Sequence, residues 1–480
     1  MGSRSTSSDR GYRLRVLMLP WLAHGHISPF LELAKKLTRK DCFVYLCSSP
    51  VNLSSIEHQL HEYQKDDQFD FASRIRLVEL HLPDHLPDLP PGRHTTKSLP
   101  THLMPTLKHA FDLSRPSFST NILAALKPDV LIYDFIQPWA PATASEMGIP
   151  AVLFLTTAAS SSAFFSHFFR GSTSTEPDKE ARYFPFPSDA IYLEEHEARK
   201  IGTRFGGRSN GLTDEDRFYQ CSDASTGFIA IKTFRELESK YIDYLSRALG
   251  KEMVPVGPLV QDSQYFRVRP PCEFTSWLDG KEKGSTVFVS FGTEYFMSEE
   301  EIEEVGLGLE LSGVHFVWVI RFPDRRDVRE ALPSGFLERV GGRGLVVEGW
   351  APQGRILAHP SVGGFLSHCG WSSVLEGMWF GVPLIALPLQ LDQPINARLV
   401  VELGVGVEVK RTERGEVRRG EVARRIREVV GAAEKVGDPH RGVNVIRAKV
   451  KQMSGKMRGK GDEEIDVFVK KLIDLCHNKA

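Results

Sequence analysis

The chain has 480 residues, of which 41% are hydrophobic and 25% charged, and its formal net charge is −1. This length exceeds one ordinary domain and predicts two domains of roughly 200–250 residues, each with its own core. The near-zero net charge excludes a global field that would draw the protein to nucleic acid or to an anionic membrane.

Apolar runs alternate with amphipathic stretches through the first half of the chain. Residues 1–12 are polar, which predicts a disordered tail and not a secretory signal. Leu14–Leu19 then indicates a buried strand, and Ser28 followed by Pro29 predicts the cap and first position of a helix. Further buried strands are predicted at residues 44–47, 75–80, 129–133 and 151–155. Residues 66–71 and 176–210 are expected to form loops or irregular insertions.

The second half of the chain repeats this alternation. Strands are predicted at residues 286–291, 315–320, 345–347, 362–366 and 383–387, and Ser298 with Glu301 predicts a capping box. Alternation of strands and helices in both halves indicates two α/β, Rossmann-like domains with parallel sheets. We place these domains at residues 13–257 and 274–455, with a linker rich in Pro and Gly at 258–273 and a C-terminal helix at 456–480.

Ligands of open α/β sheets bind beyond the carboxyl ends of the strands, so the residues that follow each strand are the first candidates for a site. His24 and His26 follow the first predicted strand, and Asp134 directly follows the strand at 129–133. A histidine oriented by a carboxylate is a common base for a hydroxyl group. The alternative is that Asp134 caps a turn and that the histidines are inert loop residues.

Residues 350–393 concentrate further candidates at predicted strand ends. Gly370, Ser372 and Ser373 open a helix, and a helix N-terminus with hydroxyl groups is suited to bind phosphate. Glu376 lies one turn further on, although it could equally form a capping box with Ser373. The remaining candidates are Trp350, which could stack on a base or pack in a core, and Asp392 with Gln393, which could read sugar hydroxyls or form a turn.

The sequence lacks the motifs of several other classes of protein. No GxGxxG dinucleotide fingerprint, GxxxxGK[ST] phosphate loop or GxSxG nucleophile elbow occurs, and the six cysteines contain no CxxC pair. The acidic triplet Asp214-Glu215-Asp216 lacks a preceding strand, so we expect a charged surface loop there and not a metal site. Between Lys410 and Lys460, 16 Lys and Arg residues stand against 6 Asp and Glu without an aromatic residue, which favours solvated helix faces over a nucleic-acid surface.

The segment at 350–393 closely resembles the signature box of plant secondary-product UDP-glycosyltransferases, which reads W-x-P-Q, H-C-G-W-N-S, E and D/E-Q. The G-H-x-x-P element around His26, VGPL at 256–259 and SFGT at 290–293 extend the resemblance along the chain. The resemblance implies a GT-B fold, in which two Rossmann-like domains face each other and the C-terminal helix packs back on the first. It also implies that the chain transfers a sugar from UDP to a small molecule.

The resemblance assigns roles to individual residues. His26 would be the catalytic base and Asp134 its partner. The UDP-binding residues would be Thr293, Trp350, Ala351, Gln353, His368, Gly370, Ser372, Ser373 and Glu376. The sugar-binding residues would be Thr157, Trp371, Asp392 and Gln393. A weaker acceptor-pocket assignment covers Trp21, His24, Phe135 and Trp139.

Two details refine the expected donor and acceptor. Ser372 replaces the asparagine that is usual in the family, so we expect altered donor contacts without loss of function. Gln393 resembles the form found in glucose users. The opening run around Pro20-Trp21, with residues 102–107 and 135–141, resembles the branch that lengthens sugar chains on terpenoids, flavonoids or lignans.

These observations predict an inverting enzyme that moves glucose from UDP-glucose to a sugar hydroxyl of a small-molecule glycoside, with a β linkage. We expect no metal and no cofactor besides the co-substrate UDP-glucose, and a cytoplasmic monomer without stable membrane insertion or nucleic-acid partners. The alternatives are an aglycone O-glucosyltransferase, other UDP-sugar donors, a pseudoenzyme that binds UDP-sugar without transfer, and, remotely, a nucleotide-dependent oxidoreductase.

Overall fold

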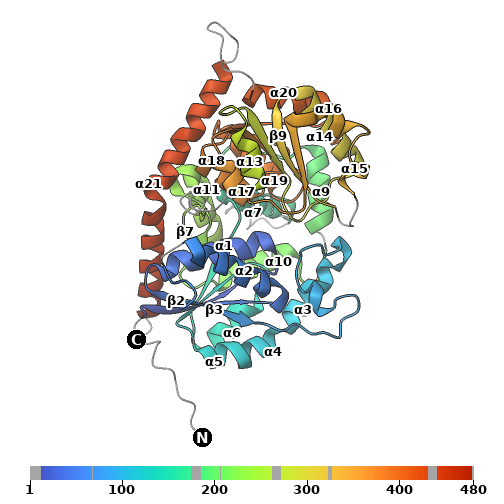
Figure 1. The fold of residues 1–480 in the computed structure, drawn as a ribbon. Helices are drawn as coiled ribbons and strands as arrows, with labels where there is room; N and C mark the ends of the chain where they lie inside the picture. Colours follow the sequence, from blue (N-terminus) through green and yellow to red (C-terminus); the bar gives the residue numbers. More distant parts are fainter. Residues whose placement is uncertain are drawn as a thin grey trace. The chain divides into compact units, whose positions relative to one another are not determined.

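The computed structural model describes residues 12–66, 69–173, 185–205, 207–261, 272–322, 327–430 and 441–477. It divides into two compact units. The first comprises Met1–Pro187, Phe205–Leu259 and Lys460–Ala480, and the second comprises Ser188–Arg204 and Val260–Gly459. Each unit contains one parallel sheet (Figure 1), so the prediction of two Rossmann-like α/β units is confirmed.

The first unit has a seven-stranded sheet in the order β3-β2-β1-β4-β5-β6-β7. Its strands are β1 (Leu14–Leu19), β2 (Cys42–Ser48), β3 (Ile75–Glu79), β4 (Val130–Tyr133), β5 (Ala151–Leu155), β6 (Phe228–Ile231) and β7 (Glu252–Pro255). The strand order reverses direction between β1 and β4, which pair in parallel with Leu19 opposite Tyr133. In sheets of this kind, such a switch point is where a ligand binds.

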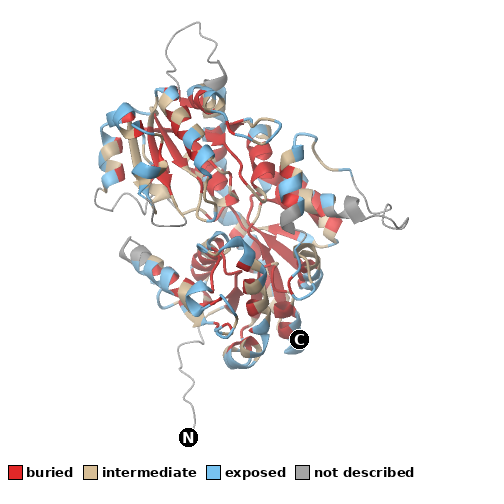
Figure 2. Cartoon of the chain, turned by 90° about the vertical axis from the view of Figure 1, so that its right-hand side faces the viewer, coloured by how far each residue is buried: buried red, intermediate tan, exposed pale blue. Residues whose placement is uncertain are grey.

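Helices connect these strands and cover the sheet. They are α1 (His24–Thr38), α2 (Pro50–Asp66), α3 (Met104–Leu113), α4 (Arg115–Ser117), α5 (Ala124–Leu126), α6 (Trp139–Glu146), α7 (Ala159–Thr173), α10 (Asp214–Ala224) and α11 (Arg235–Leu249), with the short helical segments η2 (Pro91–Arg93), η3 (Thr101–Leu103) and η4 (Phe118–Leu123). The strands are almost entirely buried (Figure 2), and their side chains form the core together with α1 and the last part of α21.

The start of α1 differs from the sequence prediction. We expected Pro29 at its first position, with Ser28 as the cap. The helix instead begins at His24, and Pro29 lies inside it. The backbone N–H groups of His26 and Ile27 both donate to the carbonyl of Ala23, so the first turn forms without a side-chain cap. His26 therefore belongs to the first turn of a helix and not to a loop.

The second unit has a six-stranded sheet in the order β10-β9-β8-β11-β12-β13, which reverses between β8 and β11. Its strands are β8 (Thr286–Ser290), β9 (His315–Ile320), β10 (Gly344–Glu348), β11 (Val362–Ser367), β12 (Leu384–Ala386) and β13 (Gly406–Glu408). The sequence predicted five of these strands within one or two residues at each end, whereas β13 was missed.

The helices of the second unit are α9 (Glu195–Phe205), α13 (Glu273–Asp279), α14 (Glu299–Ser312), α15 (Val328–Ala331), α16 (Phe336–Val340), α17 (Gln353–Leu357), α18 (Trp371–Phe380), α19 (Gln393–Glu402) and α20 (Arg419–Val430), with η5 (Gly341–Arg343). The predicted capping box of α14 is confirmed, because Ser298 and Glu301 each accept from the backbone N–H of the other. Aliphatic and aromatic side chains of β8, β9, α14, α16 and α20 form the core of this unit.

The course of the chain around residue 190 departs from the predicted boundaries. We assigned residues 13–257 to the first domain, but residues 188–204 belong to the second unit. Helix α9 occupies part of the predicted irregular insertion, and the buried guanidinium of Arg398 holds it through Glu197 at 2.9 Å while pairing with Glu408 at 3.0 Å. Residues 262–271 of the predicted linker, and the predicted tail up to residue 11, lie outside the described residues.

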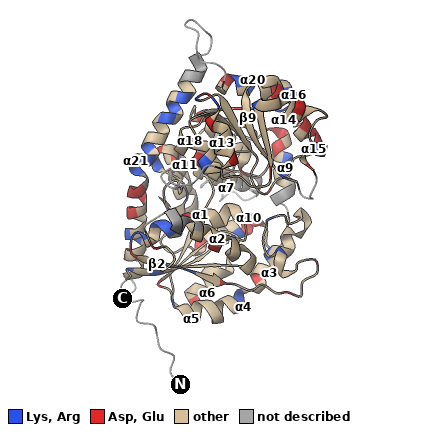
Figure 3. Cartoon of the chain, in the orientation of Figure 1, with Lys and Arg blue, Asp and Glu red and all other residues tan. Residues whose placement is uncertain are grey.

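One long helix, α21 (Arg441–His477), ends the described chain and contributes to both units. It begins earlier than the predicted start at residue 456. Lys36 of α1 pairs with Asp462 of α21 at 2.7 Å, and Lys40, which follows α1, pairs with Asp466 at 2.5 Å. Phe468 and Leu472 enter the core of the first unit. Lys and Arg residues are spaced along the part of α21 that belongs to the second unit (Figure 3).

The basic stretch between residues 410 and 460 is largely engaged within the second unit. Arg411 pairs with Glu301, Arg419 with Glu304, and Arg425 with Glu421 and Glu428. Arg447 and Arg458 donate to the backbone carbonyls of Gly284 and Trp379. These contacts fit the prediction of ordinary helix faces, since much of the positive charge is neutralised locally.

A carboxyl group in the last part of α21 makes the stability of the first unit depend on pH. Glu464 accepts the backbone N–H of Arg235 at 2.8 Å, while its second oxygen is buried and has no hydrogen-bond partner in the described structure. The pKa of Glu464 is raised from 4.5 to about 7, chiefly by burial and also by the charge of Glu236, while Arg235 and the backbone of Gly257 act to lower it. Between these pH values the unfolded chain releases a proton that the folded chain retains, so the free energy of unfolding falls as pH rises.

We therefore expect Glu464→Gln to stabilise the protein at pH 8 by roughly 1–3 kcal/mol and to change little at pH 4. The glutamine keeps a carbonyl oxygen for Arg235 and removes the ionisation. Thermal or urea unfolding at both pH values measures the effect, with the exposed neighbour Glu463→Gln as the matched control. Equal effects of Glu464→Gln at pH 4 and pH 8 would contradict this account.

Candidate active site

His26 and Asp134 lie together at the switch point of the first sheet. β1 and β4 are neighbours and run in parallel, so the residues that leave their carboxyl ends emerge at the same edge of the sheet. Asp134 follows β4 directly, and His26 lies in the first turn of α1 after β1. The sequence prediction that these two residues share one edge is consistent with this geometry.

The two side chains are hydrogen-bonded, with His26 Nδ1 at 2.7 Å from Asp134 Oδ2. Asp134 is completely buried, and His26 is 20% exposed. The backbone N–H of Trp21 donates to Asp134 Oδ2 at 3.1 Å, and that of Phe135 donates to Oδ1 at 2.8 Å. Three donors therefore converge on one buried carboxylate, which stabilises its negative charge.

This geometry determines which imidazole nitrogen can act as a base. A carboxylate only accepts hydrogen bonds, so the Nδ1 of a neutral His26 must carry the proton that it donates to Asp134. The lone pair is then on Nε2. If Nε2 takes a proton, the adjacent carboxylate stabilises the resulting imidazolium.

Thr156 is a neighbour of this pair that the sequence reasoning missed. Its Oγ1 lies 3.2 Å from His26 Nδ1. The resemblance assigns a sugar contact to the next residue, Thr157, whose hydroxyl is hydrogen-bonded to that of Ser162 at 2.7 Å. Both threonines follow β5, the strand next to β4, and this position at a strand end was the available signal.

The four predicted acceptor-pocket residues have different surroundings. Trp21 and Trp139 are buried and pack edge-on against Phe111, at centroid distances of 5.4 and 5.5 Å. Phe135 is partly exposed and lies 5.8 Å from the His26 ring, while His24 is exposed at the start of α1. Phe135 therefore makes a ring contact with His26.

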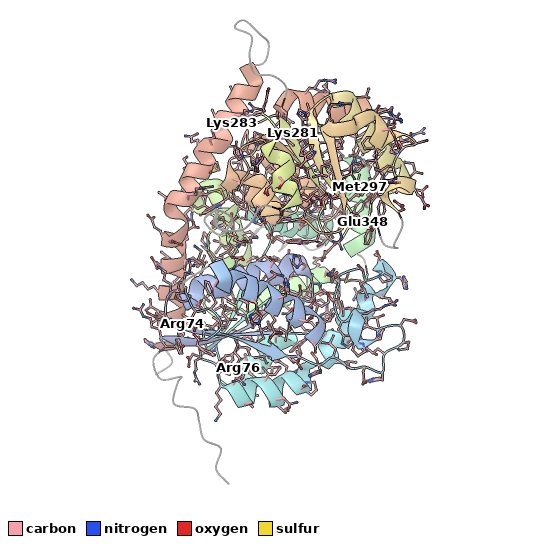
Figure 4. All side chains as sticks on the ribbon, in the orientation of Figure 1. Arg74, Arg76, Lys281, Lys283, Met297 and Glu348 are labelled. Atoms are coloured by element: carbon pink, nitrogen blue, oxygen red, sulfur yellow. The ribbon has the colours of Figure 1, made fainter. Side chains whose placement is uncertain are left out.

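In the second unit, the predicted donor residues follow the carboxyl ends of four parallel strands. Thr293 follows β8, Trp350 follows β10, His368 follows β11, and Asp392 follows β12. Figure 4 marks this edge with Met297, after β8, and Glu348, the last residue of β10; Lys281 and Lys283 precede β8 at the opposite edge. The fold thus brings separate parts of the 350–393 segment to one edge of the sheet.

His368 is held between two glycines. A Cβ atom at Gly292 would lie 2.7 Å from its Nε2, and one at Gly370 would lie 2.6 Å from it, so a side chain at either position would displace the ring. Gly292 also has a φ of +77°, which favours glycine. Burial lowers the pKa of His368 to about 4. The ring is therefore neutral at pH 7 and can offer a hydrogen bond, but not a positive charge, to a phosphate.

The side chain of Gln353 connects α17 to the first turns of α18. Its Nε2 donates to Ser373 Oγ at 3.0 Å and to Glu376 Oε2 at 2.8 Å. The alternative of a capping box between Ser373 and Glu376 is wrong, because α18 begins at Trp371 with Gly370 as N-cap and has no side-chain cap bond. Trp350 is 75% exposed, which excludes the alternative of core packing and leaves its face accessible.

The first turn of α18 offers the other predicted phosphate contacts. Gly370, Trp371 and Ser372 open the helix, whose first backbone N–H groups have no acceptor within the helix. Trp371 is buried, whereas Ser372, Ala351 and Thr293 are partly exposed. The anion-binding character expected of this terminus therefore fits its geometry.

Gln393 and Asp392 begin α19 after a tight loop. Gln393 Oε1 accepts the backbone N–H groups of Leu389 and Gln390, both at 3.0 Å. The carbonyl oxygen is thus used within the loop, so the amide N–H₂ is the group of Gln393 suited to a sugar hydroxyl.

The acidic triplet at 214–216 begins a helix and is not a loop as predicted. Asp216 forms a capping box with Thr213, and Asp214 pairs with Lys108. In the described part of the chain, no group of three or more His, Cys, Asp or Glu side chains is arranged to hold a metal ion. Within the same residues, the search for a helix with the length and apolarity of a membrane span found none.

Comparison with known proteins agrees with this geometry. Residues 13–261 match the family described as "Glycosyltransferase, N-terminal domain", and residues 266–430 match "UDP-glucoronosyl and UDP-glucosyl transferase". The chain is 48% identical to UDP-glucosyltransferase 29 of Panax ginseng, over 97% of this chain and 98% of that protein. It is 46% identical to beta-D-glucosyl crocetin beta-1,6-glucosyltransferase of Gardenia jasminoides, over 95% and 98% of the two chains.

A solved structure shares the fold. The crystal structure of Glycyrrhiza uralensis UGT73P12, complexed with glycyrrhetinic acid 3-O-monoglucuronide, superposes with a TM-score of 0.78 over 97% of each chain at 24% identity. The similarity to this structure extends over both units.

Proposed function

Because this chain belongs to the UDP-glucoronosyl and UDP-glucosyl transferase family, we propose that it transfers glucose from UDP-glucose to a sugar hydroxyl of a small-molecule glycoside. The product would carry a β linkage, and the acceptor would be a terpenoid, flavonoid or lignan glycoside. The similarity to an enzyme named for glucosyl crocetin supports a glycoside acceptor.

The observation that carries the proposal is the hydrogen bond between His26 and the buried Asp134. A protein that only binds UDP-sugar has no need of a histidine oriented by a carboxylate. The intact pair therefore favours transfer over the pseudoenzyme alternative.

The proposed reaction proceeds by a single displacement. His26 Nε2 accepts the proton of the acceptor hydroxyl, and that oxygen attacks the anomeric carbon opposite UDP, so an α-linked donor gives a β product. Asp134 stabilises the imidazolium. UDP leaves without a general acid, and its developing charge is met by neutral hydrogen-bond donors at His368, Ser372, Ser373 and the N-terminus of α18.

The other proposed contacts bind the nucleoside and the glucose of UDP-glucose. Trp350 would stack on uracil, Gln353 would contact the ribose or the base edge, and Glu376 would accept from the ribose hydroxyls. Asp392 and the amide N–H₂ of Gln393 would bind the glucose. Ser372, which replaces the usual asparagine, would donate its hydroxyl to phosphate over a shorter reach.

We further propose a metal-independent, monomeric, cytoplasmic enzyme that needs no cofactor besides UDP-glucose. The engagement of Asp214 with Lys108 and of Asp216 in a helix cap supports metal independence. The free cysteines support a reducing compartment.

The direct test is an incubation of purified protein with UDP-glucose and a monoglucoside in EDTA, with the product analysed by mass and by the anomeric proton coupling. The proposal predicts one added hexose, a β configuration and full activity in EDTA. An α product would contradict direct displacement, and a requirement for added Mn²⁺ would contradict metal independence. Binding of UDP-glucose without transfer to any acceptor or from any other UDP-sugar would favour the pseudoenzyme.

A further inference from the structure

Asn396 lies inside α19, three residues beyond the last position of the signature box, and its side chain is completely buried. Its Nδ2 donates to Asp392 Oδ2 and to the backbone carbonyl of Cys369, both at 2.9 Å. One buried amide thus connects two parts of the candidate donor site that are 23 residues apart along the chain.

The chemistry of the partners determines how this amide is oriented. A carboxylate and a carbonyl both accept hydrogen bonds, so the nitrogen of Asn396 and not its oxygen must face them. Each of its two N–H groups then has one acceptor. The oxygen Oδ1 is buried without a partner in the described structure. The two hydrogen bonds that the nitrogen donates therefore offset the cost of burying the amide.

The two partners of Asn396 lie in different kinds of backbone. Cys369 has a φ of +63°, a left-handed conformation that is strained for a residue with a Cβ atom. It lies between His368 and Gly370, directly before the N-terminus of α18. Asp392 is the N-cap of α19 and makes no side-chain cap bond; its carboxylate instead accepts from the side chain of Asn396, one turn into the same helix.

We propose that Asn396 is a positioning residue for the donor sugar, a role that rests on the proposed function. It holds the Asp392 carboxylate in the orientation that accepts glucose hydroxyls, while its bond to Cys369 keeps α19 in register with the turn at 368–370. Carboxylate oxygens can accept more than one hydrogen bond, so the bond from Asn396 leaves Asp392 able to accept from a hydroxyl.

If Asn396 has this role, its loss should weaken the binding of the glucose part of UDP-glucose and not the binding of UDP. Asp392 would contact the sugar, whereas the nucleotide would contact Trp350, Gln353 and Glu376. We therefore expect Asn396→Ala to raise the Kd for UDP-glucose roughly tenfold and to leave the Kd for UDP within about twofold of wild type. Isothermal titration of the full chain with UDP-glucose and with UDP measures both values without an acceptor.

A double-mutant comparison tests whether Asn396 acts through Asp392. If it does, adding Asn396→Ala to Asp392→Ala will change the Kd for UDP-glucose by less than about twofold, because the positioned group is already missing. If the two substitutions raise the Kd for UDP-glucose independently, so that their factors multiply in the double variant, the proposal is overturned.

Asn396→Asp keeps the shape of the side chain and provides a second variant should the alanine variant fold poorly. It places two carboxyl groups at the distance of the present hydrogen bond, and such a pair retains a shared proton at a raised pKa. We expect its Kd for UDP-glucose to approach the wild-type value as pH falls from 8 to 5.5, whereas the Kd of Asn396→Ala changes with pH only as wild type does. A Kd for Asn396→Asp that follows wild type across this range would contradict the proposal.

Val400→Ala is the matched control for general loosening of α19, because Val400 is buried one turn further along the same helix. It should leave the ratio of the two Kd values unchanged. If Asn396→Ala weakens UDP and UDP-glucose equally, its role is only structural. Failure of the wild-type protein to bind UDP-glucose would instead refute the proposed function.

Discussion

His26→Ala is expected to lower kcat by roughly 10²–10⁴-fold, which corresponds to about 3–5 kcal/mol of transition-state stabilisation. Alanine removes the nitrogen that would accept the proton of the acceptor hydroxyl, and no side chain replaces it. All residues proposed to bind UDP-glucose except Thr157 belong to the second unit, and His26 is not among them, so the Kd for UDP-glucose should remain within about twofold of wild type. Steady-state kinetics and titration calorimetry on the same preparation give both values.

His58→Ala is a matched control, because His58 is an exposed histidine of α2 in the same unit. It should keep the wild-type kcat. Retention of kcat within tenfold in His26→Ala would exclude His26 as the base. A parallel loss of UDP-glucose binding would indicate that the substitution disturbs more than proton transfer.

Asp134→Asn is expected to lower kcat by a similar factor of roughly 10²–10⁴. The carboxylate accepts from Trp21, Phe135 and His26, but an amide offers one acceptor oxygen and one donor nitrogen. If the amide nitrogen faces His26, the imidazole must accept at Nδ1 and carry its proton on Nε2, where it cannot act as a base. If the nitrogen faces Phe135, two buried N–H groups oppose each other, at a cost of about 1–3 kcal/mol in stability.

Asp129→Asn provides the matched comparison, since Asp129 precedes the amino end of β4 and Asp134 follows its carboxyl end. Asp129 accepts from the Arg15 backbone at 2.7 Å and pairs with the Arg15 side chain. Its substitution should affect stability slightly and kcat not at all. If Asp134→Asn keeps kcat within about threefold of wild type, the carboxylate does not control the tautomer of His26.

The sequence predicted most of the sheet architecture because the central strands of a parallel sheet are buried on both faces. Continuous apolar runs such as 130–133 and 151–155 leave little ambiguity. The strands that were missed, β6, β7 and β13, have three or four residues each. Runs of this length are ambiguous between strand, buried helix and loop, although β4 and β12, which are as short, were predicted.

The start of α1 shows how a local signal can mislead. Proline is favoured in the first turn of a helix, and Ser28-Pro29 matches that pattern. The actual first turn uses backbone donors to Ala23 and needs no capping side chain. Sequence position therefore placed His26 at the correct strand end but did not predict that it belongs to the helix.

Apart from the pair of His26 and Asp134, the side-chain contacts between distant parts of the chain were not predicted from the sequence. The pattern of the signature box identified Gln353, Ser373 and Glu376 separately, but not the hydrogen bonds that join them. Thr156 and Asn396 likewise acquire their significance only through the folded chain. Thr156 lies 130 residues from His26 and Asn396 lies 27 residues from Cys369, so no pattern in the sequence indicated these two contacts; the contact of Asn396 with Asp392, four residues away, has an ordinary helical spacing.

The most direct test of the account compares a monoglucoside with its own aglycone as acceptors for UDP-glucose, in EDTA, with products measured by mass. The account predicts one added hexose on the monoglucoside and none on the aglycone. Transfer to the aglycone alone would be consistent with the family but would contradict the proposal that this enzyme lengthens sugar chains.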